Sequence, residues 1–457
     1  MSRTVTYCLL LFVLLFARCS DARYTADWKS LDSRPIPTWF RGAKFGILVH
    51  WGLYSVPSFG NYSEDFWGNW QVDKKPPVVE FMNRFYKPGF TYKDFAPLFT
   101  AELFDPDQWA DIFFRSGARY VVMTANHLDG FAMWPSKFSV NWNAMDVGPR
   151  RDLVGDLSAA VRRKGGMRFG VEHSKMDRFH PFFIADKASK WKTDDFPRAK
   201  STPELKELVE RYHPDIIWSQ GDSDAPSSYW KSTSFLAWLY NDSPVRSNVV
   251  VNDRWGIDVH RKHGDFFGCE PKCYGNDLMR VNSLKTLPID KYSYGYRREA
   301  KFSDYRTVAE IIEELVTTVS RNGNLLLGVG ATKDGIIPQI FQERLFQLGT
   351  WLKVNGEAVY DSTPWKHQTD GANPNIRYTS KGNTVYVFVL KWPKNGLLYL
   401  QSLKVSSQGQ VTMLGRPTER LQLSTDLFSG IMISLSSLPQ GDLPTPWAWV
   451  LKVEGAL

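Results

Sequence analysis

The 457-residue sequence has only four cysteines and no apolar run beyond residue 22 that approaches the ~18 residues of a membrane span. Its 56 basic residues outnumber 48 acidic ones, yet they form no basic stripe of the kind that binds nucleic acid. No glycine-rich dinucleotide fingerprint or phosphate loop follows the first predicted strand. These absences point away from nucleic acids, nucleotides and a later membrane span.

The N-terminus has the pattern of a signal peptide. Arg3 precedes an apolar run of about ten residues, and small residues follow between Ala17 and Ala22. This predicts removal of residues 1–22 and a mature protein that is secreted or lysosomal. Cys8 and Cys19 lie in or beside that segment.

The remaining cysteines and two sequons fit the same route. Cys269 and Cys273 are spaced C-x3-C with no histidine pair nearby, which argues against a zinc site and favours a local disulfide. Asn61 and Asn241 begin Asn-x-Ser sequons, so both are predicted glycosylation sites. Pro244 follows the second sequon, a feature that often lowers its occupancy.

From residue 44 onward, apolar strand-like runs alternate with amphipathic helical runs. The predicted strands lie at 44–52, 119–127, 167–174, 215–221, 248–256 and 324–330, and the predicted helices at 108–118, 151–166, 202–213, 234–242, 305–323 and 337–356. Near-continuous apolar strands indicate a buried parallel sheet, and about eight repeats favour a barrel over an open sheet. The stretch between 257 and 290 reads as irregular.

Beyond this region, short β-rich runs are separated by Gly, Pro and Asn turns, which is typical of a β-sandwich. The predicted organisation is therefore a signal peptide at 1–22, a (β/α)8-like TIM barrel at 23–354 and a C-terminal β-sandwich at 355–457.

Polar residues follow the predicted strands, where a barrel of this kind carries its active site. Singly, each has an ordinary structural explanation, such as a core histidine or an ion pair between Asp253 and Arg254. Together, at successive strand ends, they predict one cleft for a polar ligand. They are His50, Trp51, Asn126, His127, Asp129, Glu172, His173, Gln220, Asp222, Asp253 and Arg254.

Several stretches resemble one enzyme family. "KFGILVHWGLYSVPSF", "ARYVVMTANHLDGFAMWPS", "NDRWG", "NGNLLLGVGATKDGIIP" and "VNGEAVYDSTPW" are similar to the lysosomal-type α-L-fucosidases of glycoside hydrolase family 29. The resemblance runs from about Asp27 to near the C-terminus. It implies a (β/α)8-like barrel with a β-sandwich, and removal of terminal α-L-fucose from glycoproteins and glycolipids by a retaining mechanism.

That mechanism needs a carboxylate nucleophile and a second carboxyl about 5–5.5 Å away. In the family the nucleophile is the aspartate of a Trp-Ser/Asn-Asp-Gly strand end, whereas this chain has Gln220 within Trp218-Ser219-Gln220-Gly221. An amide is neutral and a far weaker nucleophile. Asp222 is a candidate surrogate, because both side chains would face one way if the strand stayed extended.

The acid/base position also departs from the family pattern. The matching stretch contains Glu270, a candidate acid/base within Cys269-Glu270-Pro271-Lys272, while a second family glutamate corresponds to Leu284. Leu128 stands where the family has the second of two histidines, and Glu172 where it has a tyrosine. The resemblance implies substrate binding by matching residues, namely His50, Glu64, His127, His173, Trp218 and Arg254.

Three functions are compatible with this pattern. The first is a fucosidase-family protein directed at terminal fucose with impaired or lost hydrolysis. The second is an active retaining enzyme that uses Asp222, with Glu172 or Glu270 as the acid. The third is a secreted protein on the same scaffold that binds a protein partner. No metal or organic cofactor is predicted, and homo-oligomers occur among the relatives.

Overall fold

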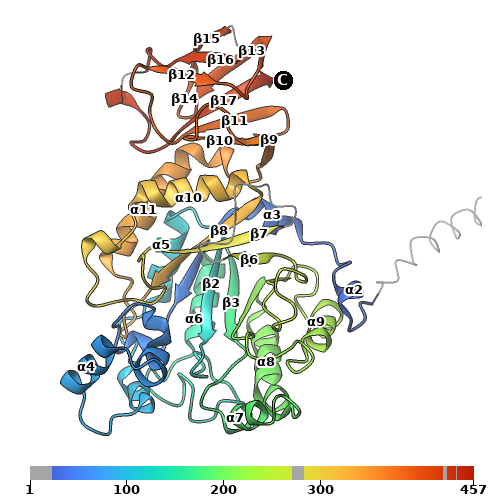
Figure 1. The fold of residues 1–457 in the computed structure, drawn as a ribbon, viewed down its shortest axis with the longest axis vertical. Helices are drawn as coiled ribbons and strands as arrows, with labels where there is room; N and C mark the ends of the chain where they lie inside the picture. Colours follow the sequence, from blue (N-terminus) through green and yellow to red (C-terminus); the bar gives the residue numbers. More distant parts are fainter. Residues whose placement is uncertain (1–22, 270–281, 426–429, 439) are drawn as a thin grey trace, which may run out of the picture.

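The computed structural model describes residues 23–269, 282–425, 430–438 and 440–457. Two parts are stacked along the long axis, a parallel sheet surrounded by helices below and antiparallel sheets above (Figure 1). The predicted fold class, a (β/α)8-like barrel followed by a C-terminal β-sandwich, is confirmed.

The lower part is built on a curled sheet of eight parallel strands in the order β5-β4-β3-β2-β1-β8-β7-β6. Its strands are β1 Phe45–His50, β2 Tyr120–Asn126, β3 Arg168–Ser174, β4 Ile216–Gln220, β5 Val250–Val251, β6 Phe267–Cys269, β7 Ser283–Pro288 and β8 Gly323–Gly330. Every residue of β1, β2 and β8 is buried, because side chains fill the barrel on one face and helices cover the other.

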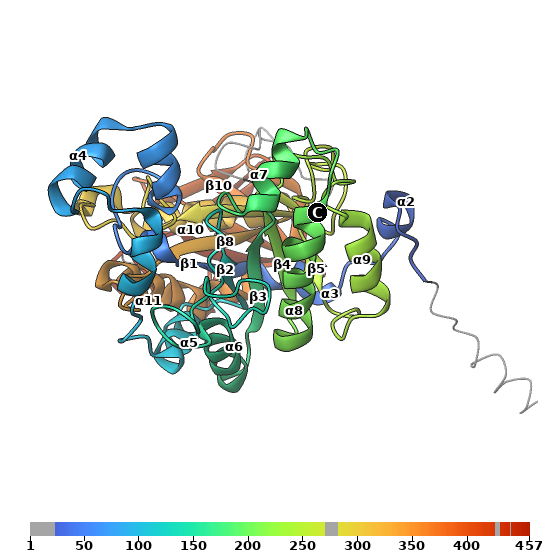
Figure 2. The same cartoon turned by 90° about the horizontal axis from the view of Figure 1, so that it is seen from below.

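Helices surround this sheet in the view along the barrel from below (Figure 2). They are α2 Trp28–Leu31, α3 Thr38–Ala43, α4 Pro76–Phe85, α5 Pro106–Arg115, α6 Leu153–Lys164, α7 Pro181–Ala188, α8 Thr202–Tyr212, α9 Ser232–Asn241, α10 Val308–Ser320 and α11 Gln339–Asn355. The six helices predicted from amphipathic periodicity are present within a few residues. None of the helices in the described ranges has the length and apolarity to cross a bilayer.

The stretch expected to be irregular, 257–290, contains the two strands β6 and β7. β6 has only three residues, and β7 carries Lys285 and ends at Pro288, so neither shows a long apolar run. The pairing of β7 with β8 fixes this segment in the sheet despite its weak pattern.

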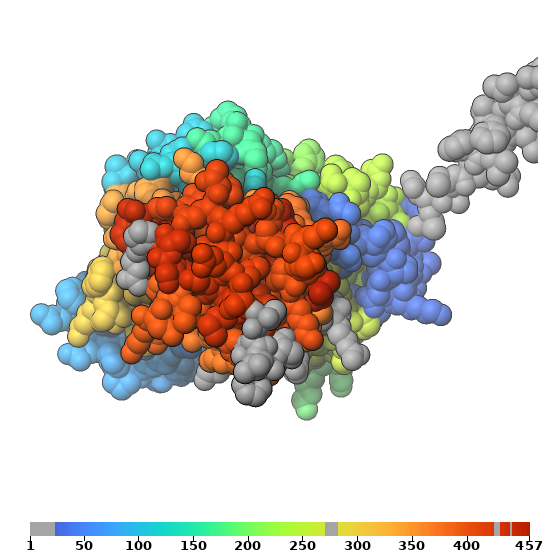
Figure 3. All heavy atoms as spheres, turned by 90° about the horizontal axis from the view of Figure 1, so that it is seen from above, coloured from blue at the N-terminus to red at the C-terminus, as the bar shows by residue number. Residues whose placement is uncertain are grey.

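The C-terminal part contains a six-stranded and a three-stranded antiparallel sheet. The strands are β9 Thr363–Thr369, β10 Ile376–Lys381, β11 Thr384–Val389, β12 Leu397–Leu400, β13 Val405–Met413, β14 Arg416–Arg420, β15 Gln422–Thr425, β16 Ile431–Ser434 and β17 Trp449–Ala456. Seen from above, this part covers much of the barrel (Figure 3). Trp351 of α11 donates to the carbonyl of Ala448 at 2.7 Å, and Lys452 pairs with Glu357 at 2.9 Å. The boundary at 354/355 stays a prediction.

Candidate functional site

Every second side chain of a barrel strand faces the inside of the barrel, and this alternation continues to the last residue of the strand. Leu48 and Trp218 belong to the apolar cluster inside the barrel. His50 lies two residues beyond Leu48, and Gln220 two residues beyond Trp218, each as the last residue of its strand. Strand alternation therefore directs both polar side chains to the same mouth of the barrel.

His50 is held there by Glu172, two strands away in the sheet. Its Nδ1 atom lies 3.3 Å from Oε2 of Glu172, and the hydroxyl of Thr124 donates to that same oxygen at 2.6 Å. Thr124 and Glu172 are register partners on β2 and β3, which explains their contact. The exposed fractions of His50 and Glu172 are 3% and 2%, so this ion pair is shielded from water.

Burial disfavours the charged form of both groups, which alone would raise the pKa of Glu172 and lower that of His50. Their mutual attraction outweighs burial. The net result is a raised pKa for His50 and a lowered pKa for Glu172, so imidazolium and carboxylate stabilise each other.

His127 and Tyr54 complete an aromatic triangle with His50. The ring centres lie 5.2 Å apart for His50 and His127, 5.6 Å for His50 and Tyr54, and 5.3 Å for Tyr54 and His127. Burial, together with the neighbouring charge of His50, lowers the pKa of His127 to about 3. The pKa values of these two neighbouring imidazoles are thus shifted in opposite directions.

Four buried polar atoms at this mouth have no hydrogen-bond partner among the described residues. They are His50 Nε2, Tyr54 Oη, His127 Nε2 and Gln220 Oε1. Leaving buried donors and acceptors unpaired costs about 1–3 kcal/mol each. A polyhydroxylated ligand, in which each hydroxyl both donates and accepts, is suited to pair with such atoms.

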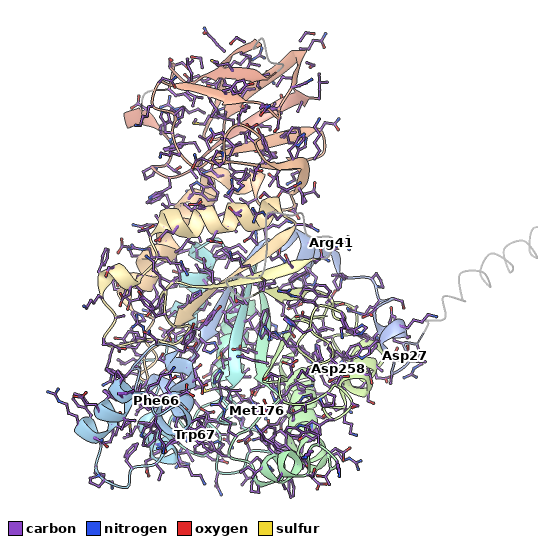
Figure 4. All side chains as sticks on the ribbon, in the orientation of Figure 1. Asp27, Arg41, Phe66, Trp67, Met176 and Asp258 are labelled. Atoms are coloured by element: carbon purple, nitrogen blue, oxygen red, sulfur yellow. The ribbon has the colours of Figure 1, made fainter. Side chains whose placement is uncertain are left out.

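Glu64 lies on the rim of the same region. Its Oε2 atom accepts from the hydroxyl of Ser293 at 2.6 Å and from the amide of Gly295 at 3.3 Å. A small hollow of about 10 Å³ is lined by Glu64, Trp67, His127, Leu128, Asp129 and Arg178, among others. Trp67 is labelled in Figure 4, at the end of the barrel away from the C-terminal sheets.

Strand β4 stops at Gln220 because Gly221 turns the chain. Gly221 has φ +68°, and a Cβ there would lie 2.7 Å from Ser174 Oγ and 3.3 Å from Leu128 Cδ2. Only glycine adopts this conformation without strain in such a tight space.

This turn directs Asp222 away from the extended path. Its carboxylate accepts from the amide of Gly256 at 2.9 Å and interacts with the buried ammonium of Lys175. The condition for placing Asp222 and Gln220 on one face, a strand that stays extended, is therefore not met. Asp222 instead joins the loops that follow β3, β4 and β5.

The residues after β5 connect two edges of the sheet. Asp253 accepts from the amides of Gly268 and Arg261, each at 2.9 Å. Its neighbour Arg254 is half-buried. The Oδ2 atom of Asp253 also lies 3.6 Å from Nε2 of His260. The structural ion pair between Asp253 and Arg254 stays a prediction.

His173 does not lie with the other predicted binding residues at the mouth of the barrel. It alternates with Glu172 and faces outward, where Nε2 lies 3.4 Å from Glu204 on α8. The ring is fully buried in this second polar cluster, with Lys200 paired to Glu204 at 3.2 Å. Its position between the sheet and the helices indicates a structural role.

The modification sites divide between different environments. Asn61 is exposed, whereas the side-chain amide of Asn241 makes two 2.8 Å hydrogen bonds with the backbone of Tyr24. Cys269 is buried at the end of β6. Its predicted disulfide partner Cys273, the candidate acid Glu270 and the predicted signal peptide lie outside the described residues.

Sequence reasoning did not assign Tyr54 or Thr124 to the site. It placed Glu172 at the cleft and considered it as an acid, but it did not identify Glu172 as the partner of His50. Thr124 could have been found from the sequence. It lies two residues beyond Val122 on a buried strand, so both side chains face the inside of the barrel. Within the described ranges, no three His, Cys, Asp or Glu side chains are grouped so that they could hold a metal ion.

Comparison with known proteins agrees with this architecture. Residues 12–357 match the family model described as alpha-L-fucosidase, and residues 368–454 match the alpha-L-fucosidase C-terminal domain. Human tissue alpha-L-fucosidase is 49% identical over 454 residues, which cover 98% of this chain and 97% of that protein. Human plasma alpha-L-fucosidase is 47% identical over 443 residues, with coverages of 96% and 94%.

A solved structure shows the same fold. The Thermotoga maritima alpha-fucosidase in complex with fucose has a TM-score of 0.80 and 32% identity, and the match covers 94% of this chain and 100% of that chain. On the family models, the relatives and the fold together, this chain belongs to the α-L-fucosidase family.

Proposed function

We propose that the cleft at the carboxyl ends of β1–β4 binds terminal α-L-fucose of glycoproteins and glycolipids, and that hydrolysis is strongly impaired or lost. The observation that carries this proposal is the position of Gln220. Its neutral amide stands at the inward-facing end of β4, where the family pattern has the nucleophilic aspartate.

Retaining glycoside hydrolysis requires an anion at that position. The nucleophile must form an ester with the anomeric carbon, and its charge stabilises the oxocarbenium-like transition state. An amide supplies neither function. Removing a catalytic nucleophile in other hydrolases lowers turnover by about 10⁴–10⁶-fold.

The other inward positions support the same proposal. Leu284, at the second family glutamate position, is fully buried in the apolar cluster inside the barrel. Glu172 is committed to His50 and Thr124. The hydrogen bond of Asp222 to Gly256 and its interaction with Lys175 count against it as a relocated nucleophile.

Binding is supported by the groups that the cleft retains. His50 and His127 each direct a buried nitrogen that lacks a protein partner, and Glu64 lies at the rim. A site that had lost all contact with sugar would gain stability by replacing these groups with apolar ones. The Thermotoga maritima relative was solved with fucose bound.

The decisive experiment compares Gln220→Asp with Gln220→Asn on an aryl α-L-fucoside whose leaving group needs little protonation. The two variants have the same shape and differ only in charge. We expect turnover from Gln220→Asp alone, while the wild type and Gln220→Asn bind fucose by calorimetry without turnover. Efficient hydrolysis by the wild type would overturn the proposal, and absence of fucose binding would favour the protein-partner function.

The cellular setting is also proposed. Residues 1–22 act as a signal peptide, and the mature chain, a barrel at 23–354 with a β-sandwich at 355–457, is secreted or lysosomal. The tissue and plasma types of its relatives support this route. Fucosylated glycans are the proposed partners, and a homo-oligomer is compatible with the fold.

A further inference from the structure

A second polar pocket lies at the amino ends of the barrel strands, opposite the proposed fucose cleft. It has a volume of about 530 Å³ and is lined by Ile36, Thr38, Arg41, Gly42, Lys44, Asn282, Asn322, Asp361, Ser362 and Thr363. Figure 4 labels Arg41 beside the junction of barrel and C-terminal sheets, far from Trp67 and Met176 near the other end. Nothing in the proposed fucose chemistry uses this pocket.

Lys44 is the central feature of the pocket. Its exposed fraction is 3%, yet among the described residues its ammonium group has no ion pair within 4.0 Å and no hydrogen bond. The backbone holds it in place, because its carbonyl accepts from the amide of Leu325 at 2.8 Å. Its φ of 59° is in the left-handed region, which a lysine adopts only when the surrounding structure imposes it.

A largely buried ammonium without a close counter-ion is costly, since water solvates the charge only in part. Burial accordingly lowers the pKa of Lys44 to about 8, and the carboxylate of Asp361 opposes this shift only in part. Asp361 lines the same pocket and lies farther than 4.0 Å from the ammonium group. The ammonium is therefore near the pocket and lacks a close counter-ion.

Arg41 adds a second positive charge. It is exposed, and among the described residues its guanidinium has no ion pair within 4.0 Å. Lys44 and Arg41 carry +2 against −1 for Asp361, which leaves a surplus of +1 in a pocket that also contains hydroxyl and amide side chains. An ammonium point charge and a guanidinium fork that line the same pocket suit an anion with several oxygen atoms.

We propose that this amino-end pocket binds a tetrahedral oxyanion, sulfate or phosphate, either as the free ion or as an ester on a sugar. The oxyanion would pair with Lys44 and Arg41 and thereby supply the counter-ion that the protein does not provide. The pocket volume accommodates a monosaccharide attached to the anion.

The test uses the full mature chain at pH 7, with sodium sulfate and sodium phosphate compared with sodium chloride at equal ionic strength. We expect both oxyanions to raise the melting temperature in a concentration-dependent manner, with saturable binding in calorimetry. Binding should weaken as the pH rises from 7 to 9, because Lys44 loses its proton at about 8. Galactose 6-sulfate distinguishes the sources: tighter binding than inorganic sulfate identifies a sugar ester, and equal or weaker binding identifies the free ion.

Two variants and one control make the result specific. Lys44→Met should weaken oxyanion affinity about tenfold or more, and Arg41→Gln about three- to tenfold. Lys353→Met removes an exposed lysine outside this pocket and should leave the affinity unchanged. Arg41 is exposed, so its variant tests the proposal even if Lys44→Met does not fold. An equal response to sulfate and chloride, or a sulfate effect that survives both variants, would overturn it.

Discussion

His50 Nδ1 and Glu172 Oε2 lie 3.3 Å apart on strands that are not neighbours, β1 and β3, and the hydroxyl of Thr124 on the strand between them donates to Glu172. The pair thus spans the strand β2 at the mouth of the barrel. It fixes the orientation of the His50 ring, so that Nε2 is the nitrogen left to meet a ligand.

The first prediction concerns the pH dependence of stability. His50 has a raised pKa, so its contribution is complete below its ordinary value of 6.5 and is lost as pH rises through the folded-state value. Glu172 has a lowered pKa, so its contribution is complete above 4.5 and is lost as pH falls through the folded-state value. Glu172→Gln should therefore reduce the free energy of unfolding by about 1–3 kcal/mol, most strongly between these two values.

Denaturant titrations at several pH values measure this effect. Thr124→Ser keeps the hydroxyl bond to Glu172 and serves as the control. A stability difference between wild type and Glu172→Gln that stays constant from pH 4 to 9 would show that the ion pair does not form.

The second prediction compares two buried histidines. His127→Ala should weaken fucose binding about tenfold, because it removes a nitrogen directed into the cleft. His173→Ala should leave fucose affinity within about twofold but destabilise the fold by about 1–3 kcal/mol, since Glu204 loses a partner in a buried cluster. Calorimetry and chemical denaturation on both variants would separate these roles. Loss of fucose binding in His173→Ala with an intact fold would contradict this assignment.

The third prediction concerns Asp222. Asp222→Asn should leave the aryl-fucosidase activity of the Gln220→Asp variant within about threefold and lower stability by about 1–3 kcal/mol, because the buried ammonium of Lys175 loses the attraction of a nearby carboxylate. Activity assays and denaturation of the double variant test both parts. Complete loss of turnover, with the fold intact, would show that Asp222 takes part in the chemistry.

The fourth prediction concerns glycosylation. Asn61 is exposed and should carry a glycan, whereas Asn241 is held by the backbone of Tyr24 and followed by Pro244, so its occupancy should be low. Peptide mass spectrometry before and after deglycosylation measures both sites. Asn61→Gln should remove most of the mass shift, and a shift that remains in this variant would place the glycan elsewhere.

The regular parts of the fold could be predicted because their residues satisfy one clear pattern. The continuous apolar run of β1 predicts a buried strand, and the amphipathic periodicity of α6 predicts a helix that packs on the sheet. β6 was not predictable from such a pattern, because three residues carry no periodicity and only pairing with β7 defines them.

The candidate site was predictable only as far as strand ends could be located. The inward direction of His50 and Gln220 could be predicted, because side chains alternate between the two faces of a strand. The same alternation gives the outward direction of His173, but only once the face of the strand that lies inside the barrel is known. The turn of Asp222 depends on the positive φ of Gly221. A glycine after a strand indicates a turn, but it does not show in which direction the next side chain points.

The edges of the parallel sheet meet without a regular ladder between β5 and β6 in the described residues. Asp253 accepts from the amide of Gly268, and Asp265 accepts from the amide of Val251 at 2.9 Å, so carboxylates join the two edges. β6 and β7 remain joined to β1 through their ladders with β8. The seam therefore separates them from β5 and not from His50, and a change in their register would reach the strand that carries His50.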